Sequence, residues 1–253
     1  MKTSKLIYYL RKWYPEWAGY EGDFIGLQTG ELKEHTNTIV LCLDFDHQVF
    51  NRIKGKHVDL ILTHHPLLYG NRDEILSYDE VKRALIEKID RLHIPCYSMH
   101  TNFDGGKKGM NAALAEKLGL VNVHPLKNEK LCRGGTLPKA MDINDFAKMV
   151  KRVLKLPKIY LINKGKKRIK KVALCGGSGA GDFVHAMNEG YDIFLSGDAP
   201  HHIRHDVSRY HFNYIEIMHE VEQIFIEVMY KRLKSLDPKL KIIRVPQEYP
   251  KFI

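Results

Sequence analysis

The sequence has no long apolar run. No stretch approaches the roughly 20 apolar residues that a membrane-spanning helix needs, and residues 1–14 lack the apolar core of a secretory signal. We therefore expect a cytoplasmic protein with no membrane partner. Hydrophobic residues still make up 44% of the 253 residues, which suffices for the core of one large or two ordinary domains.

Cysteine is scarce and forms no paired motif. The four cysteines make no Cys-x-x-Cys, and three of them lie in apolar runs typical of strands. We expect them to be reduced, buried and inert. They are Cys42, Cys96, Cys132 and Cys175.

Acidic residues are absent from residues 146–181. This block holds eleven Lys and Arg residues, so the net charge of +10 is concentrated there and the rest of the chain is nearly neutral. Such a block could attract phosphates, nucleic acid or an anionic small molecule. We favour the alternative, a solvated helix face and a Lys-rich hairpin turn at residues 163–166, because no recognised nucleic-acid motif accompanies the charges.

The glycine-rich segment 175–181 matches no nucleotide-binding motif. It lacks both the Gly-Lys-Ser/Thr of a P-loop and the dinucleotide fingerprint with its acidic partner. Its backbone N–H groups could hold an anion at the start of the next helix. Close packing of a strand against a helix is the interpretation we favour.

Apolar patterns alternate along the chain between strand and helix and predict the α/β class. We expect two lobes, each a mixed β-sheet flanked by helices: residues 1–124 with 215–253, carrying a metal site, and residues 125–214, carrying a basic hairpin. The expected strands are residues 38–43, 58–62, 95–99, 131–137, 158–162, 169–174, 192–195, 213–218 and 241–245. The expected helices are residues 5–13, 79–92, 110–118, 143–154, 201–210 and 220–233.

Two adjacent histidines follow a strand that reads as buried on both faces. His64 and His65 come directly after residues 58–62, and Pro66 stops a regular continuation. Ligands of open α/β sheets bind beyond the carboxyl ends of strands. The pair therefore reads as half of a metal site, although a solvated loop pair is the commoner outcome for His-His alone.

Two other strand ends supply further candidate ligands. Asp104 follows residues 95–99, His219 follows residues 213–218, and Glu222 lies on the same face of a first helical turn as His219. Each has an ordinary alternative: Asp104 as a turn residue, Glu222 as a complement to the helix dipole. The mixture of imidazole and carboxylate suits Zn, Fe, Mn, Co or Ni, whose identity the pattern leaves open.

Five segments occur in the order seen in one family: residues 21–30, 63–66, 100–104, 196–202, and His219 with Glu222. With them the chain resembles the family of NGG-one-interacting factor three, whose bacterial members are called GTP cyclohydrolase I type 2-like. The match extends from near residue 5 to about residue 233. It implies a two-lobed α/β fold, a toroidal homohexamer and two divalent metal ions in each subunit.

The resemblance also implies a ligand set. In many members the last of these segments reads Gly-His-x-x-x-Glu. Here Met218 replaces the glycine, and Gln223 stands four residues after His219. Glu222 matches members with glutamate at plus three, and Glu220 is the fallback. The ligands implied for the dinuclear site are His64, His65, Asp104, His219 and Glu222.

Three functions remain open. The first is a hydrolase resembling GTP cyclohydrolase I type 2, in which metal-activated water attacks a nucleotide-like substrate and His100 moves protons. The second is a metal (iron) trafficking protein without turnover. The third is a DNA-binding or regulatory module that uses residues 146–181. His100 could instead be a further ligand or orient one, and His201 and His202 could reach the same cleft or be structural.

Overall fold

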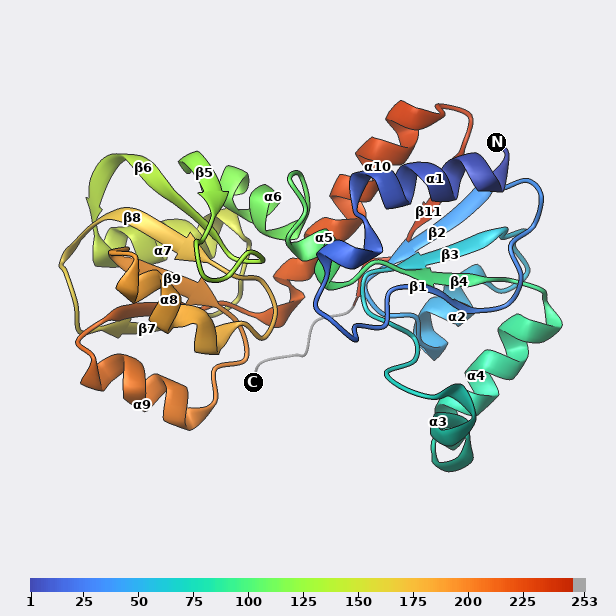
Figure 1. Ribbon diagram of the computed structural model, residues 1–253, viewed down its shortest axis with the longest axis horizontal. Coiled ribbons are helices and arrows are strands. Elements are labelled where there is room, and N and C mark those ends of the chain that lie inside the picture. Colours follow the sequence, from blue (N-terminus) through green and yellow to red (C-terminus); the bar gives the residue numbers. More distant parts are fainter. Residues whose placement is uncertain (248–253) are drawn as a thin grey trace. The chain divides into compact units, whose positions relative to one another are not determined.

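The structure, a computed structural model, describes residues 1–247 and confirms the α/β class. It divides into two compact units (Figure 1): Met1–Phe103 with the chain from Phe225 onward, and Asp104–Ile224. The expected boundaries lay near residues 124 and 214. The structural division differs because α6 (Met110–Lys117) packs against strands of the second sheet, and because residues 215–224 belong to the second unit.

The sheet of the first unit is mixed. β1 is antiparallel to β4, and every other neighbouring pair is parallel. Because β2, β3 and β4 run in one direction, the segments that follow them emerge at one edge of the sheet. The strand order is β1 (Gly26–Thr29), β4 (Cys96–Ser98), β3 (Leu60–Thr63), β2 (Thr38–Cys42) and β11 (Lys241–Arg244).

Helices cover both faces of this sheet. α1 and α10 lie over one face, and α2 and α4 over the other (Figure 1). Every residue of β2 and β3 is buried, as their apolar runs predicted. The helical segments are α1 (Thr3–Trp13), η1 (Glu16–Ala18), α2 (His47–Ile53), α3 (Arg72–Tyr78), α4 (Glu80–Arg91), α5 (Thr101–Asp104), which ends in the second unit, and α10 (Ile224–Leu236), which begins there.

The sheet of the second unit is also mixed. β8, β9 and β10 are parallel neighbours, whereas β5–β6, β6–β8 and β10–β7 are antiparallel pairs. The order is β5 (Val121–Pro125), β6 (Arg133–Asp142), β8 (Arg168–Leu174), β9 (Ile193–Ser196), β10 (Asn213–Glu216) and β7 (Tyr160–Asn163). Its helices are α6, α7 (Ile143–Val153), η2 (Ala180–Asp182), α8 (Phe183–Asn188), α9 (His201–Arg209) and η3 (His219–Gln223).

The predicted basic hairpin is wrong. β7 and β8 do not pair, because β9 and β10 lie between them. The buried end of β8 requires a strand on each side, whereas the half-exposed β7 suits an edge. Asn213 holds the connection between them: its side chain accepts from the Gly165 N–H and donates to the Lys166 carbonyl, each at 2.8 Å.

Several local predictions are confirmed. Asp142 caps α7 by accepting from the Asn144 N–H, and Gly119 follows α6 with φ +72°. All four cysteines are free and buried. Within residues 1–247, no helix has the length and apolar character needed to cross a membrane.

Candidate metal centre

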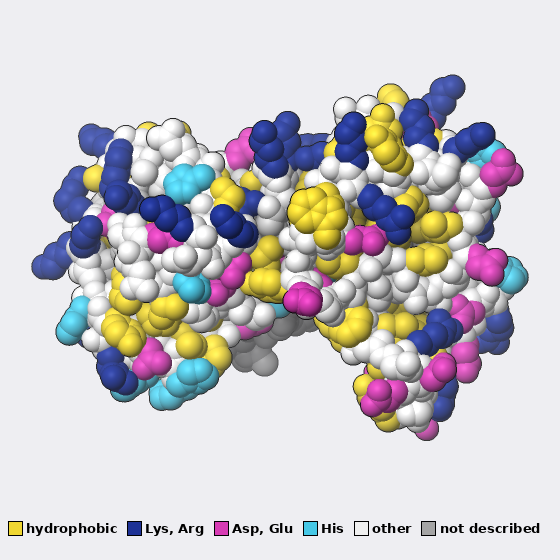
Figure 2. Space-filling model, in the orientation of Figure 1, with side chains coloured by type: hydrophobic (Ala, Val, Ile, Leu, Met, Phe, Trp, Pro, Cys, Tyr) yellow, Lys and Arg dark blue, Asp and Glu magenta, His cyan; other side chains and the backbone are white. Residues whose placement is uncertain are grey.

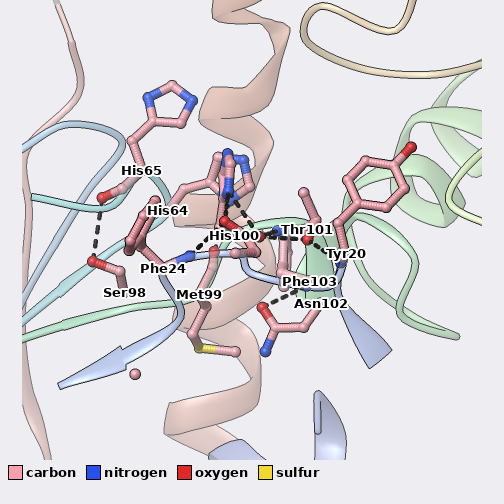
Figure 3. Close-up of polar contacts among 12 residues, drawn as sticks. Tyr20, Phe24, His64, His65, Ser98, Met99, His100, Thr101, Asn102 and Phe103 are labelled. Atoms are coloured by element: carbon pink, nitrogen blue, oxygen red, sulfur yellow. Dashed lines mark hydrogen bonds and ion pairs between the residues drawn. The ribbon is translucent and has the colours of Figure 1, made fainter. Parts of the chain in front are cut away.

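Three histidines converge at the carboxyl edge of the first unit's sheet. His64 and His65 follow β3, and His100 follows β4. The His64 ring centroid lies 4.9 Å from that of His65 and 5.5 Å from that of His100, and Figure 3 shows the three residues around the start of α5. The parallel pairing of β3 with β4 brings them together.

Nδ1 of each of these imidazoles lies within hydrogen-bond distance of an oxygen acceptor. The acceptor is the Met99 carbonyl for His64, Asp44 for His65 and Asp23 for His100, each at 2.8 Å. A carbonyl or carboxylate oxygen accepts and does not donate, so Nδ1 is the donor, and in the neutral imidazole Nε2 then carries the lone pair. Metal-ligating histidines have this arrangement.

Asp23 is a firmly ionised partner of His100. Burial alone would raise the pKa of Asp23, but hydrogen bonds from His100 and Thr101 outweigh burial and lower the pKa to about 2. The Thr101 hydroxyl donates to Asp23 at 2.5 Å. The imidazole of His100 is thus fixed in orientation by a carboxylate that stays charged at neutral pH.

The second unit holds a matching pair. His219 begins η3, directly beyond the β10 end of the sheet, and its Nε2 lies 3.0 Å from Oε2 of Glu222. Its Nδ1 donates to Asp198 at 2.5 Å. The predicted i,i+3 neighbour relation is therefore present, although in a 3-10 helix instead of an α-helix.

These two carboxylates change the titration of His219. The hydrogen bond to Glu222 raises the pKa of His219 the most, and Asp198 raises it further. Burial lowers it, and the resulting pKa is about 9. Two carboxylates around one imidazole favour a cation at this position. The donor set, imidazole nitrogen and carboxylate oxygen, fits a divalent transition metal ion.

A glycine contact fixes Glu222. Gly177 has φ +65°, and a side chain there would collide with Oε1 of Glu222. The glycine-rich segment between β8 and α8 therefore packs closely on this carboxylate. Glu222 is 4% exposed, whereas Glu220 lines an open pocket.

Asp104 ends α5 and is buried. It is the first residue of the second unit and lies four residues after His100 in the chain. Asp104 and Glu222 are the two carboxylates of the ligand set that the sequence predicts, and both belong to the second unit.

A pocket of about 260 Å³ opens beside His219 within the second unit. Arg204 forms a two-pronged ion pair with Glu216 at 2.7 and 2.8 Å, and its guanidinium lies 5.4 Å from the Tyr160 ring centroid. Lys158 supplies a second cation. The lining residues are Lys158, Ile159, Tyr160, Asp198, Arg204, Glu216, Ile217, Met218, His219 and Glu220.

Other sequence candidates lie elsewhere. His201 and His202 begin α9, are exposed and do not line this pocket. The Lys and Arg residues of positions 146–181 are exposed apart from the half-buried Lys158, and Figure 2 shows Lys and Arg side chains along the outer edge of the second unit. Lys166 pairs with Asp192 at 2.6 Å. This arrangement agrees with the solvated face that the sequence favoured.

The sequence interpretation missed the carboxylates that orient the histidines. Asp44 follows β2 and Asp198 follows β9, so each stands at a strand end, as the predicted ligands do. That position was the available signal. It was not sufficient, because the order of strands decides which carboxylate reaches which imidazole.

Known proteins resemble the chain over nearly its whole length. A family model described as Duf34/NIF3 (NGG1p interacting factor 3) matches residues 1–250. The "GTP cyclohydrolase 1 type 2 homolog" of Lactococcus lactis is 28% identical over 246 residues, covering 96% of this chain and 95% of the relative. The Clostridium perfringens protein of the same name is 30% identical over 229 residues, covering 87% of each. The solved structure "Reduced HcgD from Methanocaldococcus jannaschii" has a TM-score of 0.82 and 27% identity, covering 96% of this chain and 97% of that chain.

Proposed function

The chain belongs to the Duf34/NIF3 family, and from this premise we propose a metal-dependent, hydrolase-like protein that acts on a nucleotide-like substrate. Two divalent metal ions are held by one set of ligands. Imidazole and carboxylate donors in this number leave coordination positions for water, because five ligands cannot saturate two ions. The set is His64, His65, Asp104, His219 and Glu222.

The observation that carries the proposal is the common orientation of the imidazoles. His64, His65 and His219 each donate from Nδ1 to an oxygen acceptor. A histidine held in this way offers Nε2 to a metal ion with its ring direction already fixed. A histidine in a solvated loop needs no such acceptor. Three histidines held in this way at strand ends therefore favour a metal site over solvated loops.

Aromatic side chains hold the His64 ring within the first unit. The His64 ring packs against Phe103 and Phe225, with centroids at 5.9 and 5.6 Å, and all three residues belong to the first unit. Asp104 directly follows Phe103, and Glu222 precedes Phe225 by three residues.

When bound, the two ions would lower the pKa of a coordinated water and offset negative charge that develops on the substrate. His100 is the residue that we assign to proton movement. Its Nε2 accepts a proton, while Asp23 holds Nδ1 and stabilises the imidazolium that forms. The same residue later returns that proton to the leaving group.

The pocket beside His219 offers an aromatic surface to a planar ring. Tyr160 provides this surface, exposed over 52% of its area, on which a ring can stack. The charged lining is mixed, with Lys158 and Arg204 beside Asp198, Glu216 and Glu220. The aromatic surface suits the base of a nucleotide. The names of the relatives point to the same substrate class.

The test is the metal content of protein purified without chelator, followed by incubation with GTP. We expect wild type to consume GTP, and His65→Ala to lose metal and turnover. His201→Ala is the matched control, because it removes an exposed histidine. Metal retained without turnover on GTP or other nucleotides would favour metal trafficking, and equal metal in wild type and His65→Ala would overturn the ligand set.

We also propose a homohexamer, as the family resemblance implies. Native mass spectrometry at low micromolar protein is the measurement. A mass of six times 29.3 kDa supports it, and a monomer or dimer at all concentrations contradicts it.

A further inference from the structure

Cys132 and Cys175 lie opposite one another beside the ends of two neighbouring strands of the second unit. Arg133 pairs with Leu174 in the antiparallel β6–β8 ladder, so the residue before β6 stands opposite the residue after β8. Asp182, at the end of η2, reaches the same point: its Oδ2 lies 3.6 Å from Sγ of Cys132. One donor atom from each of these three residues lies within 4.8 Å of the others.

We propose that Cys132, Cys175 and Asp182 form a second metal site, independent of the histidine ligands, that takes a thiophilic divalent cation of the zinc type. Zinc binds thiolate sulfur at about 2.3 Å and carboxylate oxygen at about 2.0–2.2 Å, in tetrahedral geometry. Those lengths place a sulfur and an oxygen of one site about 3.6 Å apart. The Cys132–Asp182 separation fits this value without rearrangement.

A buried guanidinium supplies the charge balance. Arg133 is 4% exposed. Its side-chain hydrogen bonds run to backbone carbonyls, and no carboxylate within residues 1–247 forms an ion pair with it. A buried charge requires compensation. Two thiolates, one carboxylate and a dication carry a net charge of about −1, and the guanidinium next to Cys132 neutralises it.

The surroundings hold the donors in place. Both cysteines lie in the apolar core of the second unit, with exposures of 0% and 6%. Nδ2 of Asn111 lies 3.8 Å from Sγ of Cys175, as a donor to the sulfur. Hydrogen bonds to ligand sulfurs of this kind orient metal ligands.

The glycine-rich segment closes over the cluster. A side chain at position 179 would place its Cβ 2.7 Å from Sγ of Cys175 and 3.2 Å from Oδ2 of Asp182. Gly179 therefore permits the loop to bring the aspartate onto the two sulfurs. This gives a second reason, besides the contact of Gly177 with Glu222, for the density of glycine here.

The experiment is a Co²⁺ titration of the reduced, metal-free full-length protein. Thiolate ligation gives sulfur-to-cobalt charge-transfer absorption in the near ultraviolet, and imidazole and carboxylate ligands give none. We expect this absorption to reach, at saturation, the amplitude of one thiolate-bound Co²⁺ per subunit, and the same amplitude in wild type and in His65→Ala. Its persistence in His65→Ala separates this site from the ligand set proposed above.

Substitutions locate the signal. Cys175→Ala should abolish the absorption, and Asp182→Asn, which preserves the side-chain shape, should weaken Co²⁺ binding at least about tenfold, the size of effect that loss of a ligand or its support has on metal affinity. Cys42→Ala is the control, a buried cysteine of the first unit. No charge-transfer absorption in wild type, or unchanged absorption in Cys175→Ala, would overturn the site. A further contrary result would be that Cys132 and Cys175 are isolated as a disulfide, and that the reduced protein binds Co²⁺ without that absorption.

Discussion

Nε2 of His219 lies 3.0 Å from Oε2 of Glu222, within a single turn of 3-10 helix. Asp198 accepts from the other ring nitrogen of the same histidine. A group between two carboxylates binds a cation more strongly than an isolated imidazole does. In the protein without metal that cation is a proton, and a metal ion that takes Nε2 must displace it.

Glu222→Gln should lower the pKa of His219 from about 9 toward the ordinary value of 6.5, because the hydrogen bond to Glu222 is the largest cause of the shift. Histidine C–H resonances followed by NMR across pH in the metal-free protein measure this directly. Glu220→Gln, next to the same histidine in sequence, is the comparison. An unchanged pKa in Glu222→Gln, or an equal fall in Glu220→Gln, contradicts the assignment.

Metal affinity should rise with pH up to about 9. The folded-state pKa of His219 is raised, so below that pH a proton occupies the ligand and competes. One released proton changes the affinity by about tenfold per pH unit, and the contribution of His219 ends above its pKa. Competition against a chelator of known affinity between pH 7 and 9.5 gives the slope, and a flat profile over this range is the contrary result.

Asp23→Asn should reduce kcat while leaving metal content unchanged. The substitution removes the charge that orients His100 and stabilises its imidazolium. A general acid–base group is worth about 10²–10⁴ in rate, and we expect a loss within that range. Asp206→Asn on α9 is the control. Loss of metal in Asp23→Asn would contradict this role and show instead that His100 binds the metal or orients one of its ligands.

Gly177→Ala should destabilise the protein and weaken metal binding together. Gly177 has φ +65° and contacts Glu222, whereas Gly190 has φ +76° with open space around it. Both alanine variants incur the left-handed backbone cost of about 1–2 kcal/mol. Only Gly177→Ala displaces the carboxylate, so urea unfolding should show a larger loss for it, and metal affinity should fall in that variant alone.

The strand ends were the most predictable part of the molecule. The apolar run before His64 predicted a buried strand, and β3 is one; the spacing of His219 and Glu222 predicted neighbours, and they are in contact. Both inferences depend only on local periodicity. Residues a few positions apart are constrained by backbone geometry whatever the tertiary fold.

Relations that depend on strand order were not predictable in this way. Two short strands around a basic turn read as a hairpin, yet β9 and β10 separate β7 from β8. For the same reason the sequence did not predict the contact of Asp44 with His65, which requires β2 to lie beside β3. Nor did it predict that Cys132 lies opposite Cys175. These residues are 43 positions apart in sequence and meet only through the β6–β8 register.

The most direct test of the central claim is an anomalous-scattering map of crystals grown with one transition metal and collected at its absorption edge. The account predicts two peaks in each subunit, coordinated by Nε2 of the histidines and by the carboxylates of the set. Any peak at the cysteines would be separate from these. Absence of metal density at His64, His65 and His219, in crystals where metal is bound elsewhere on the chain, would contradict it.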